Sequence, residues 1–112
     1  MDNKREFFHL RSELCKALSH PKRQEILVTL REEELTVSEL VEKSRIPRPN
    51  LSQHLALLKS RGVILVRRKG HKSYYRLSDQ RILQAYDMIS EILLESLSSQ
   101  KTVVKKAIGT RT

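Results

Sequence analysis

The segment RPNLSQHLALLKSRGVI, residues 48–64, begins with polar side chains whose types and spacing suit the reading of nucleic acid bases. The amides of Asn and Gln pair with adenine in the DNA major groove, and Arg either pairs with guanine or holds a phosphate. A serine hydroxyl binds either a base or a phosphate. The candidate base-reading residues are therefore Arg48, Asn50, Ser52, Gln53 and His54.

These side chains differ in how directly they face outward when the segment is helical. Gln53 points most directly away from a stripe of leucines that would be buried. His54 lies one turn from both Leu51 and Leu58, so it flanks that stripe. A histidine packed at the edge of the helix and a histidine that contacts DNA are both open interpretations.

Positive charge is concentrated in the middle third of the chain. The sequence has 22 Lys and Arg against 13 Asp and Glu, a net charge of +9, and no acidic residue lies between Glu42 and Asp79. This segregation favours a surface that faces phosphates; the alternative is a basic surface that only keeps the protein in solution. The candidate phosphate contacts in this interval are Arg67, Arg68, Lys69, His71 and Lys72.

Three helices are predicted before this segment, from periodicity and capping signals. Apolar residues at three- and four-residue steps predict a first helix over residues 4–18. Pro21 suits the first turn of a second helix, which ends near the acidic run at 32–34. Thr36 and Glu39 have the spacing of a capping box and start a short third helix.

A fourth helix and a hairpin follow. Pro49 fits a first helical turn, and Gly62 suits a left-handed stop. The buried stripe of this helix is Leu51, Leu55 and Leu58. Residues 63–66 form an apolar, β-branched run and residues 73–77 alternate, so we expect a two-stranded hairpin with a basic tip.

The remaining chain is predicted to form one long helix and a tail. Ser78 or Asp79 caps the helix, whose apolar stripe carries more surface than one small core can cover. Residues 98–112 are basic with little pattern, and we expect a mobile tail, with a helical beginning as an open alternative. Residues 1–97 are expected to form one domain for DNA binding and dimerisation. The fold is thus mainly α with a small β-hairpin, a winged helix-turn-helix in the order α-α-α-α-β-β-α.

Composition excludes several other classes of protein. The chain of 112 residues has no apolar run long enough for a membrane span and no signal peptide pattern, so we expect a cytoplasmic protein that does not bind membranes. Its single cysteine rules out an internal disulfide and paired-cysteine zinc motifs. No phosphate loop, nucleophile-base pattern or metal cluster indicates an enzyme, and no cofactor is expected.

Three stretches also resemble the ArsR-type (SmtB/ArsR) transcriptional repressors of bacteria and archaea. They are ALSHPKRQEILVTL, ELTVSELVEKSRIPRPNLSQHLALLKSRGVI and RRKGHKSYYRLS, and together they span most of residues 17–78. The resemblance implies a symmetric homodimer joined through the first and last helices, which binds double-stranded DNA at an imperfect palindrome. The residues expected at the dimer interface are Phe7, Leu10, Leu14, Ile82, Tyr86, Ile89 and Leu93.

The known sensor sites of such repressors are not matched by this sequence. One metal site resembles ELCVCDL on the third helix, where this chain has hydroxyls at Thr36 and Ser38. A second uses Asp and His pairs on the last helix, which contains no histidine here. Redox-sensing relatives use two cysteines, whereas Cys15 is alone and its helical spacing predicts a buried apolar position. We expect no metal site, and the effector is not indicated.

Two alternatives to a DNA-binding repressor stay open at this point. A winged helix can dock a protein partner instead of DNA, although such a module does not need an acid-free basic interval. The second alternative is a redox-responsive regulator that acts through an intersubunit disulfide or a modified thiol at Cys15.

Overall fold

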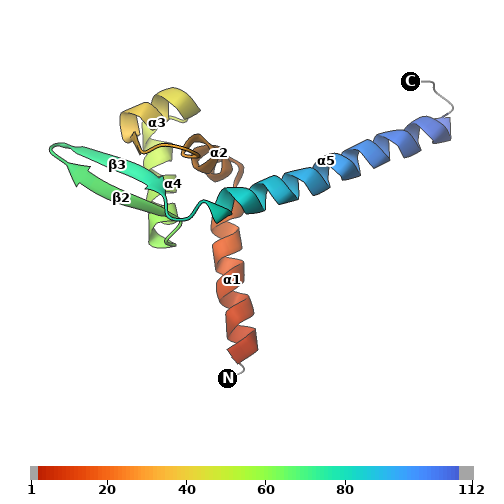
Figure 1. Ribbon diagram of the computed structural model, residues 1–112, viewed down its shortest axis with the longest axis horizontal. Helices are drawn as coiled ribbons and strands as arrows, with labels where there is room; N and C mark the ends of the chain where they lie inside the picture. The colour runs from red at the N-terminus through yellow and green to blue at the C-terminus, as the bar shows by residue number, and fades with distance from the viewer. Residues whose placement is uncertain (1–2, 109–112) are drawn as a thin grey trace. The chain divides into compact units, whose positions relative to one another are not determined.

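A computed structural model describes residues 3–108, with side chains for residues 3–100. The chain divides into two units, one that ends at Gln80 and one that begins at Arg81. The elements of the first unit (Figure 1) are α1 (Asn3–Ser19), α2 (Pro21–Thr29), β1 (Leu35–Thr36), α3 (Val37–Ser44), α4 (Arg48–Ser60), β2 (Ile64–Lys69) and β3 (Lys72–Leu77). This order confirms the predicted winged helix-turn-helix and adds one short strand.

The starts of α2 and α3 follow from local side-chain chemistry. Pro21 occupies the first turn of α2, and the Nδ1 atom of His20 accepts the backbone N–H of Lys22 at 3.1 Å. At α3, Thr36 Oγ1 accepts the Glu39 N–H at 3.2 Å while Glu39 Oε1 accepts the Thr36 N–H at 3.0 Å. The predicted capping box is therefore present, and it satisfies two backbone donors that the helix itself cannot.

The turn between α3 and α4 is made without glycine. Arg45 ends α3 in the left-handed conformation, with φ at 61°, which L-residues adopt at some cost. Ile46 fixes the turn because its side chain is 3% exposed and its N–H donates to Ser44 Oγ at 3.2 Å. Pro47 then precedes α4, which begins at Arg48, one residue earlier than we expected.

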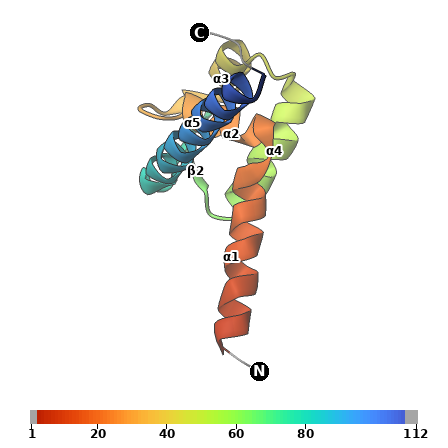
Figure 2. The ribbon, with the colours of Figure 1, turned by 90° about the vertical axis from the view of Figure 1, so that its right-hand side faces the viewer.

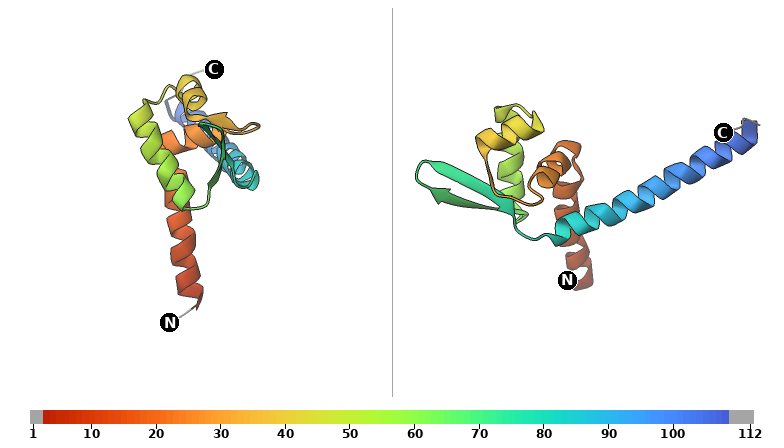
Figure 3. Two further views of the ribbon diagram at one scale, coloured as in Figure 1. Left: turned by 90° about the vertical axis from the view of Figure 1, so that its left-hand side faces the viewer. Right: turned by 45° about the horizontal axis from the view of Figure 1, so that its top comes forward.

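The sheet has three antiparallel strands in the order β1-β3-β2, because the two-residue strand β1 joins the predicted hairpin. Leu35 pairs with Tyr75, and Val66 pairs with Tyr75 from the other side. Gly70, with φ at 62°, makes the turn at the tip of the hairpin, which projects beyond the helices as the wing (Figure 3). At the wing's base, Ser78 donates both its N–H and its hydroxyl to the Val63 carbonyl, each at 2.9 Å.

A continuous apolar core holds α2, α3, α4 and the sheet together. The leucine stripe of α4 is buried as predicted, with Leu51 and Leu58 0% exposed and Leu55 2% exposed. The other core residues of the first unit are Ala17, Ile26, Leu27, Leu30, Leu35, Leu40, Ile46, Val63, Ile64 and Leu77. Burial of this stripe fixes which face of α4 is left for solvent or a partner.

Helix α1 contributes little to that core. Ala17 is the only residue along it that is buried, and its N-terminal part extends away from α2, α3 and α4 (Figure 2). Cys15 is exposed, so our expectation of a buried cysteine is wrong. Helical spacing identifies the apolar face of α1, but no other element of the first unit covers that face at Cys15.

The second unit is the single helix α5, Arg81–Ile108. It continues well past Leu97, where we expected it to end, because no glycine or proline interrupts the chain before Gly109. Residues 109–112 of the expected tail, and the side chains from Lys101 onward, lie outside the described residues. The helices that the structure describes are each too short or too polar to cross a bilayer.

Candidate nucleic-acid interface

The N-terminal half of α4 presents the polar side chains that were predicted to read bases. Asn50, Ser52 and Gln53 are exposed, and so is Arg48 at the first position of the helix. The buried leucines on the opposite side hold the helix against the core. In helix-turn-helix proteins the first turns of the second helix enter the major groove, so this exposed face has the required placement.

His54 does not share that exposed face. It is half-buried, and its ring centroid lies 4.8 Å from that of His20 at the start of α2. Burial lowers the pKa of His54 below its ordinary value of 6.5, and the nearby His20 and Arg23 lower it further. Of the two interpretations left open by the sequence, the structure therefore favours packing at the helix edge.

The wing places two neighbouring arginines, both expected to contact phosphate, on opposite faces of the sheet. Alternate residues of a strand lie on opposite faces of the sheet. Arg67 pairs across the wing with Tyr74, whereas Arg68 pairs with Ser73, so the two arginines lie on different faces. Arg68 shares its face with the buried Ile64, which lies on the same strand.

Arg67 is held by an acid from outside the acid-free interval. Its Nε atom donates to both carboxylate oxygens of Glu34 at 2.8 Å, and its guanidinium lies 4.9 Å from the centroid of Tyr74. Arg76 also approaches Glu34, at 3.8 Å. The structure therefore gives Arg67 a partner within the protein, where we had expected a phosphate contact.

The tip of the wing carries positive charge, and no acid of the described residues lies within 4.0 Å of Lys69 or Lys72. Lys69 and Lys72 are directly opposed across β2 and β3, and both are exposed. Like charges at opposed positions repel each other and destabilise a hairpin. A bound anion would relieve that repulsion, which supports a phosphate-facing role for the tip, where His71 is exposed as well.

The basic residues of the acid-free interval between Glu42 and Asp79 fall into two groups, those with an acid nearby and those without one. Acids within 4.0 Å are found for Lys43, Arg61, Arg67 and Arg76. Among the described residues, no such partner is found for Arg45, Arg48, Lys59, Arg68, Lys69 and Lys72. All but Lys59 lie in the helix-turn-helix turn, at the start of α4 or on the wing. Arg45 is a residue that sequence reasoning missed; its basic side chain in the turn before α4 was the available signal.

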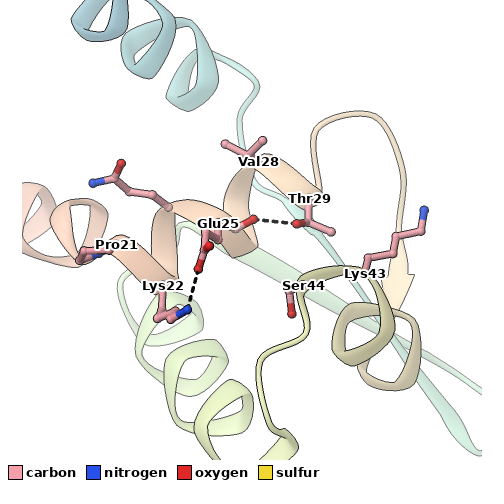
Figure 4. A pocket seen from close by; sticks show the side chains of 8 residues that line it. Pro21, Lys22, Glu25, Val28, Thr29, Lys43 and Ser44 are labelled. Carbon is pink, nitrogen blue, oxygen red and sulfur yellow. Dashed lines mark hydrogen bonds and ion pairs between the residues drawn. The ribbon is translucent and has the colours of Figure 1, made fainter. Parts of the chain in front are cut away.

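Another surface depression lies between α2 and the end of α3 (Figure 4), with a volume of about 650 Å³. Its two lysines are both paired: Lys22 contacts Glu25 at 3.3 Å, and Lys43 contacts Glu33 at 2.6 Å. This depression is therefore less suited to an anion than the surface formed by α4 and the wing.

Both units leave large apolar side chains in solvent. On α1, Phe7 is 58% exposed and Leu10 is 61% exposed, while on α5 Ile89 is 62% exposed and Leu93 is 56% exposed. Leu14 is exposed, whereas Ile82 and Tyr86 are half-buried. Further exposed apolar residues are Phe8, Met88, Ile92, Leu94 and Leu97. Apolar faces of this extent are typical of surfaces that a partner covers.

The region resembling a thiolate metal site has a different role in this structure. Thr36 caps α3, and Ser38 Oγ accepts a hydrogen bond from Arg48 Nη2 at 2.8 Å. Within the described part of the chain, no three His, Cys, Asp or Glu side chains are grouped in a way that would hold a metal ion.

A helix-turn-helix with an exposed polar recognition helix and a basic β-wing defines the winged helix-turn-helix class of DNA-binding folds. The model for bacterial regulatory proteins of the arsR family matches residues 20–65. The chain is 37% identical over 79 residues to the biofilm growth-associated repressor of Xylella fastidiosa, covering 70% of this chain and 69% of that protein. It therefore belongs to the arsR family of regulatory proteins rather than to an enzyme family.

Two further relatives extend the comparison. The HTH-type transcriptional repressor SmtB of Mycobacterium tuberculosis is 41% identical over 78 residues, which cover 70% of this chain but only 58% of SmtB. The solution structure of the homodimeric winged helix-turn-helix DNA-binding domain of Mb0332 from Mycobacterium bovis superposes with a TM-score of 0.74 at 25% identity, covering 85% of this chain and 88% of that domain.

Proposed function

We propose that this protein is a sequence-specific DNA-binding transcriptional repressor that acts as a homodimer. The observation that carries the proposal is the joint exposure of Asn50, Ser52 and Gln53 on α4. Next to it, in the turn before α4 and on the wing, four cations have no acid within 4.0 Å among the described residues: Arg45, Arg68, Lys69 and Lys72. The amide side chains supply base contacts, and the cations supply phosphate contacts. Repression, rather than activation, is supported by the names of SmtB and of the biofilm growth-associated repressor.

The homodimer is supported by the exposed apolar faces of α1 and α5. Large side chains such as Leu10 and Ile89 are more than half exposed in one protomer, and burying them in a second copy stabilises the pair by about 25 cal/mol for each Å² removed from water. Mb0332, which has the same fold, is described as homodimeric. We infer that Phe7, Leu10, Leu14, Ile82, Tyr86, Ile89 and Leu93 contribute to the interface.

A twofold dimer sets the form of the operator. Two recognition helices presented about 34–36 Å apart read half-sites whose centres are about 10–10.5 base pairs apart, or a multiple of that distance. The operator is therefore an imperfect inverted repeat. We also infer that the repressor works without the thiolate metal site of its relatives, because Thr36 is engaged as a helix cap and Ser38 as an acceptor for Arg48.

Selection of duplexes from a random library tests this function. The full-length protein is incubated with the library at moderate salt, and the retained duplexes are sequenced after several rounds. We expect enrichment of an inverted repeat with the stated spacing. Absence of any enriched sequence, together with weak salt-insensitive binding, would favour a winged helix that docks a protein partner.

A further inference from the structure

A second, smaller depression lies where the start of α3, the start of α4 and the wing meet. Its volume is about 290 Å³. The lining residues on which the argument depends are Ser38, Arg48, His71, Lys72 and Ser73. Three separate elements thus contribute basic or hydroxyl side chains to one site, which includes Arg48 at the start of α4.

Ser38 and Arg48 are already joined inside this depression. Ser38 Oγ accepts a hydrogen bond from Arg48 Nη2 at 2.8 Å, across ten residues of sequence. The bond occupies one N–H of the guanidinium, which has five donors in a planar fork. Because Arg48 has no acidic partner among the described residues, its other donors remain available to an anion.

The start of α3 lines the same site through Thr36, Val37 and Ser38. The capping box uses the N–H groups of Thr36 and Glu39. The Glu39 carboxylate accepts hydrogen bonds from Thr36, which lower the pKa of Glu39, and the charges of Lys43 and Lys72 lower it further.

The charge and hydrogen-bonding chemistry of the depression suit a phosphodiester. Arg48 and Lys72 supply two positive charges, while Ser38 and Ser73 supply hydroxyl groups as neutral donors. The first helix of a helix-turn-helix crosses the DNA backbone when the second enters the groove, so a backbone phosphate reaches this position.

We propose that Ser38 positions Arg48 to bind one phosphate of the DNA backbone in this depression, with Lys72 binding it from the wing. The proposal rests on the DNA-binding function given above and names a contact within it. Ser38 acts through Arg48: it limits the rotamers of a long side chain whose ordering otherwise costs free energy on binding. The contact fixes the register of α4 on the duplex and carries no base specificity of its own.

A double-mutant cycle tests the role of Ser38. Affinity for a fixed duplex is measured by fluorescence anisotropy for the wild type, Ser38→Ala, Arg48→Ala and the double variant. Ser38→Ala is expected to lower affinity about threefold to tenfold for each protomer of the bound dimer in the wild-type background, the range for one lost hydrogen bond. It is expected to have no further effect once Arg48 is alanine. Ser38→Thr, which keeps the hydroxyl, is expected to restore binding.

A matched control and a fold check complete the design. Ser60→Ala removes a hydroxyl that donates only to the Leu57 carbonyl at the end of α4, and it should leave affinity unchanged. Urea unfolding of Ser38→Ala should match that of the wild type, because Ser38 is exposed. Equal losses in both Arg48 backgrounds, or wild-type affinity of Ser38→Ala, would overturn the positioning role alone. A wild-type protein that binds no duplex would instead overturn the proposed function together with this role.

Discussion

The contrast between Arg67 and Arg68 gives a quantitative prediction for DNA binding. Arg67 is held by Glu34 on one face of the wing. Arg68 lies on the other face and has no acid within 4.0 Å among the described residues. Each phosphate neutralised contributes about 0.9 to the slope of log affinity against log salt. With one Arg68 in each wing of the homodimer, Arg68→Gln is expected to reduce the magnitude of that slope by about 1.8.

Arg67→Gln is the matched variant, and it should affect folding more than binding. Its loss removes an exposed ion pair, which contributes about 0.2–1 kcal/mol. It also removes the contact with Tyr74, which contributes about 0.5–1 kcal/mol. We therefore expect the free energy of unfolding to fall by about 1 kcal/mol. The effect is limited because Arg76 stays 3.8 Å from Glu34.

The assay is a set of anisotropy titrations on one duplex at several KCl concentrations, with urea unfolding of each variant in parallel. The wild-type slope should be no steeper than about −9, since each protomer offers up to five cations in this region with no acid within 4.0 Å among the described residues. A reduction in slope for Arg67→Gln as large as that for Arg68→Gln would refute the assignment. An unchanged slope for Arg68→Gln would refute it equally.

Three further predictions concern pH, assembly and helix capping. Burial lowers the pKa of His54, so this side chain binds a proton more readily in the unfolded chain than in the folded one. The free energy of unfolding should therefore decrease as pH falls below about 6.5. Urea unfolding across pH should show a flatter dependence for His54→Gln than for the wild type. In analytical ultracentrifugation, Leu93→Glu should shift the protein from dimer to monomer, because it places a charge in the apolar interface. Gln84→Glu, on the polar side of α5, should leave the dimer intact. A dimeric Leu93→Glu variant would contradict the proposed interface. Thr36→Ala should lower the free energy of unfolding by about 1 kcal/mol because it removes the cap of α3, whereas equal stability in chemical denaturation would show that the cap contributes nothing.

Most of the fold could be predicted because its signals are local. The leucine period of α4, the capping box at Thr36 and the left-handed Gly62 each specify an element within a few residues. Strand β1 was missed because two residues are too few to show a period. The end of α5 was placed too early because basic, weakly patterned sequence was interpreted as a tail, although nothing in it breaks a helix.

The candidate site could be predicted in type but not in detail. The exposed positions of Asn50 and Gln53 follow from the leucine stripe on the opposite side of α4. The pairing of Arg67 with Glu34 joins residues 33 positions apart, and no sequence pattern indicates it. Likewise, spacing shows that Cys15 lies near an apolar face, but it does not show whether another element covers that face.

The central claim is that exposed polar side chains of α4 read base sequence, and one pair of titrations tests it directly. Affinity is measured for Gln53→Ala and for Lys72→Gln on a selected inverted repeat and on a scrambled duplex of equal length. Gln53→Ala should lose roughly tenfold or more on the repeat and little on the scrambled duplex. Lys72→Gln should weaken both about equally, because a phosphate contact is present on any sequence. Equal losses of Gln53→Ala on the two duplexes would contradict base reading by this helix.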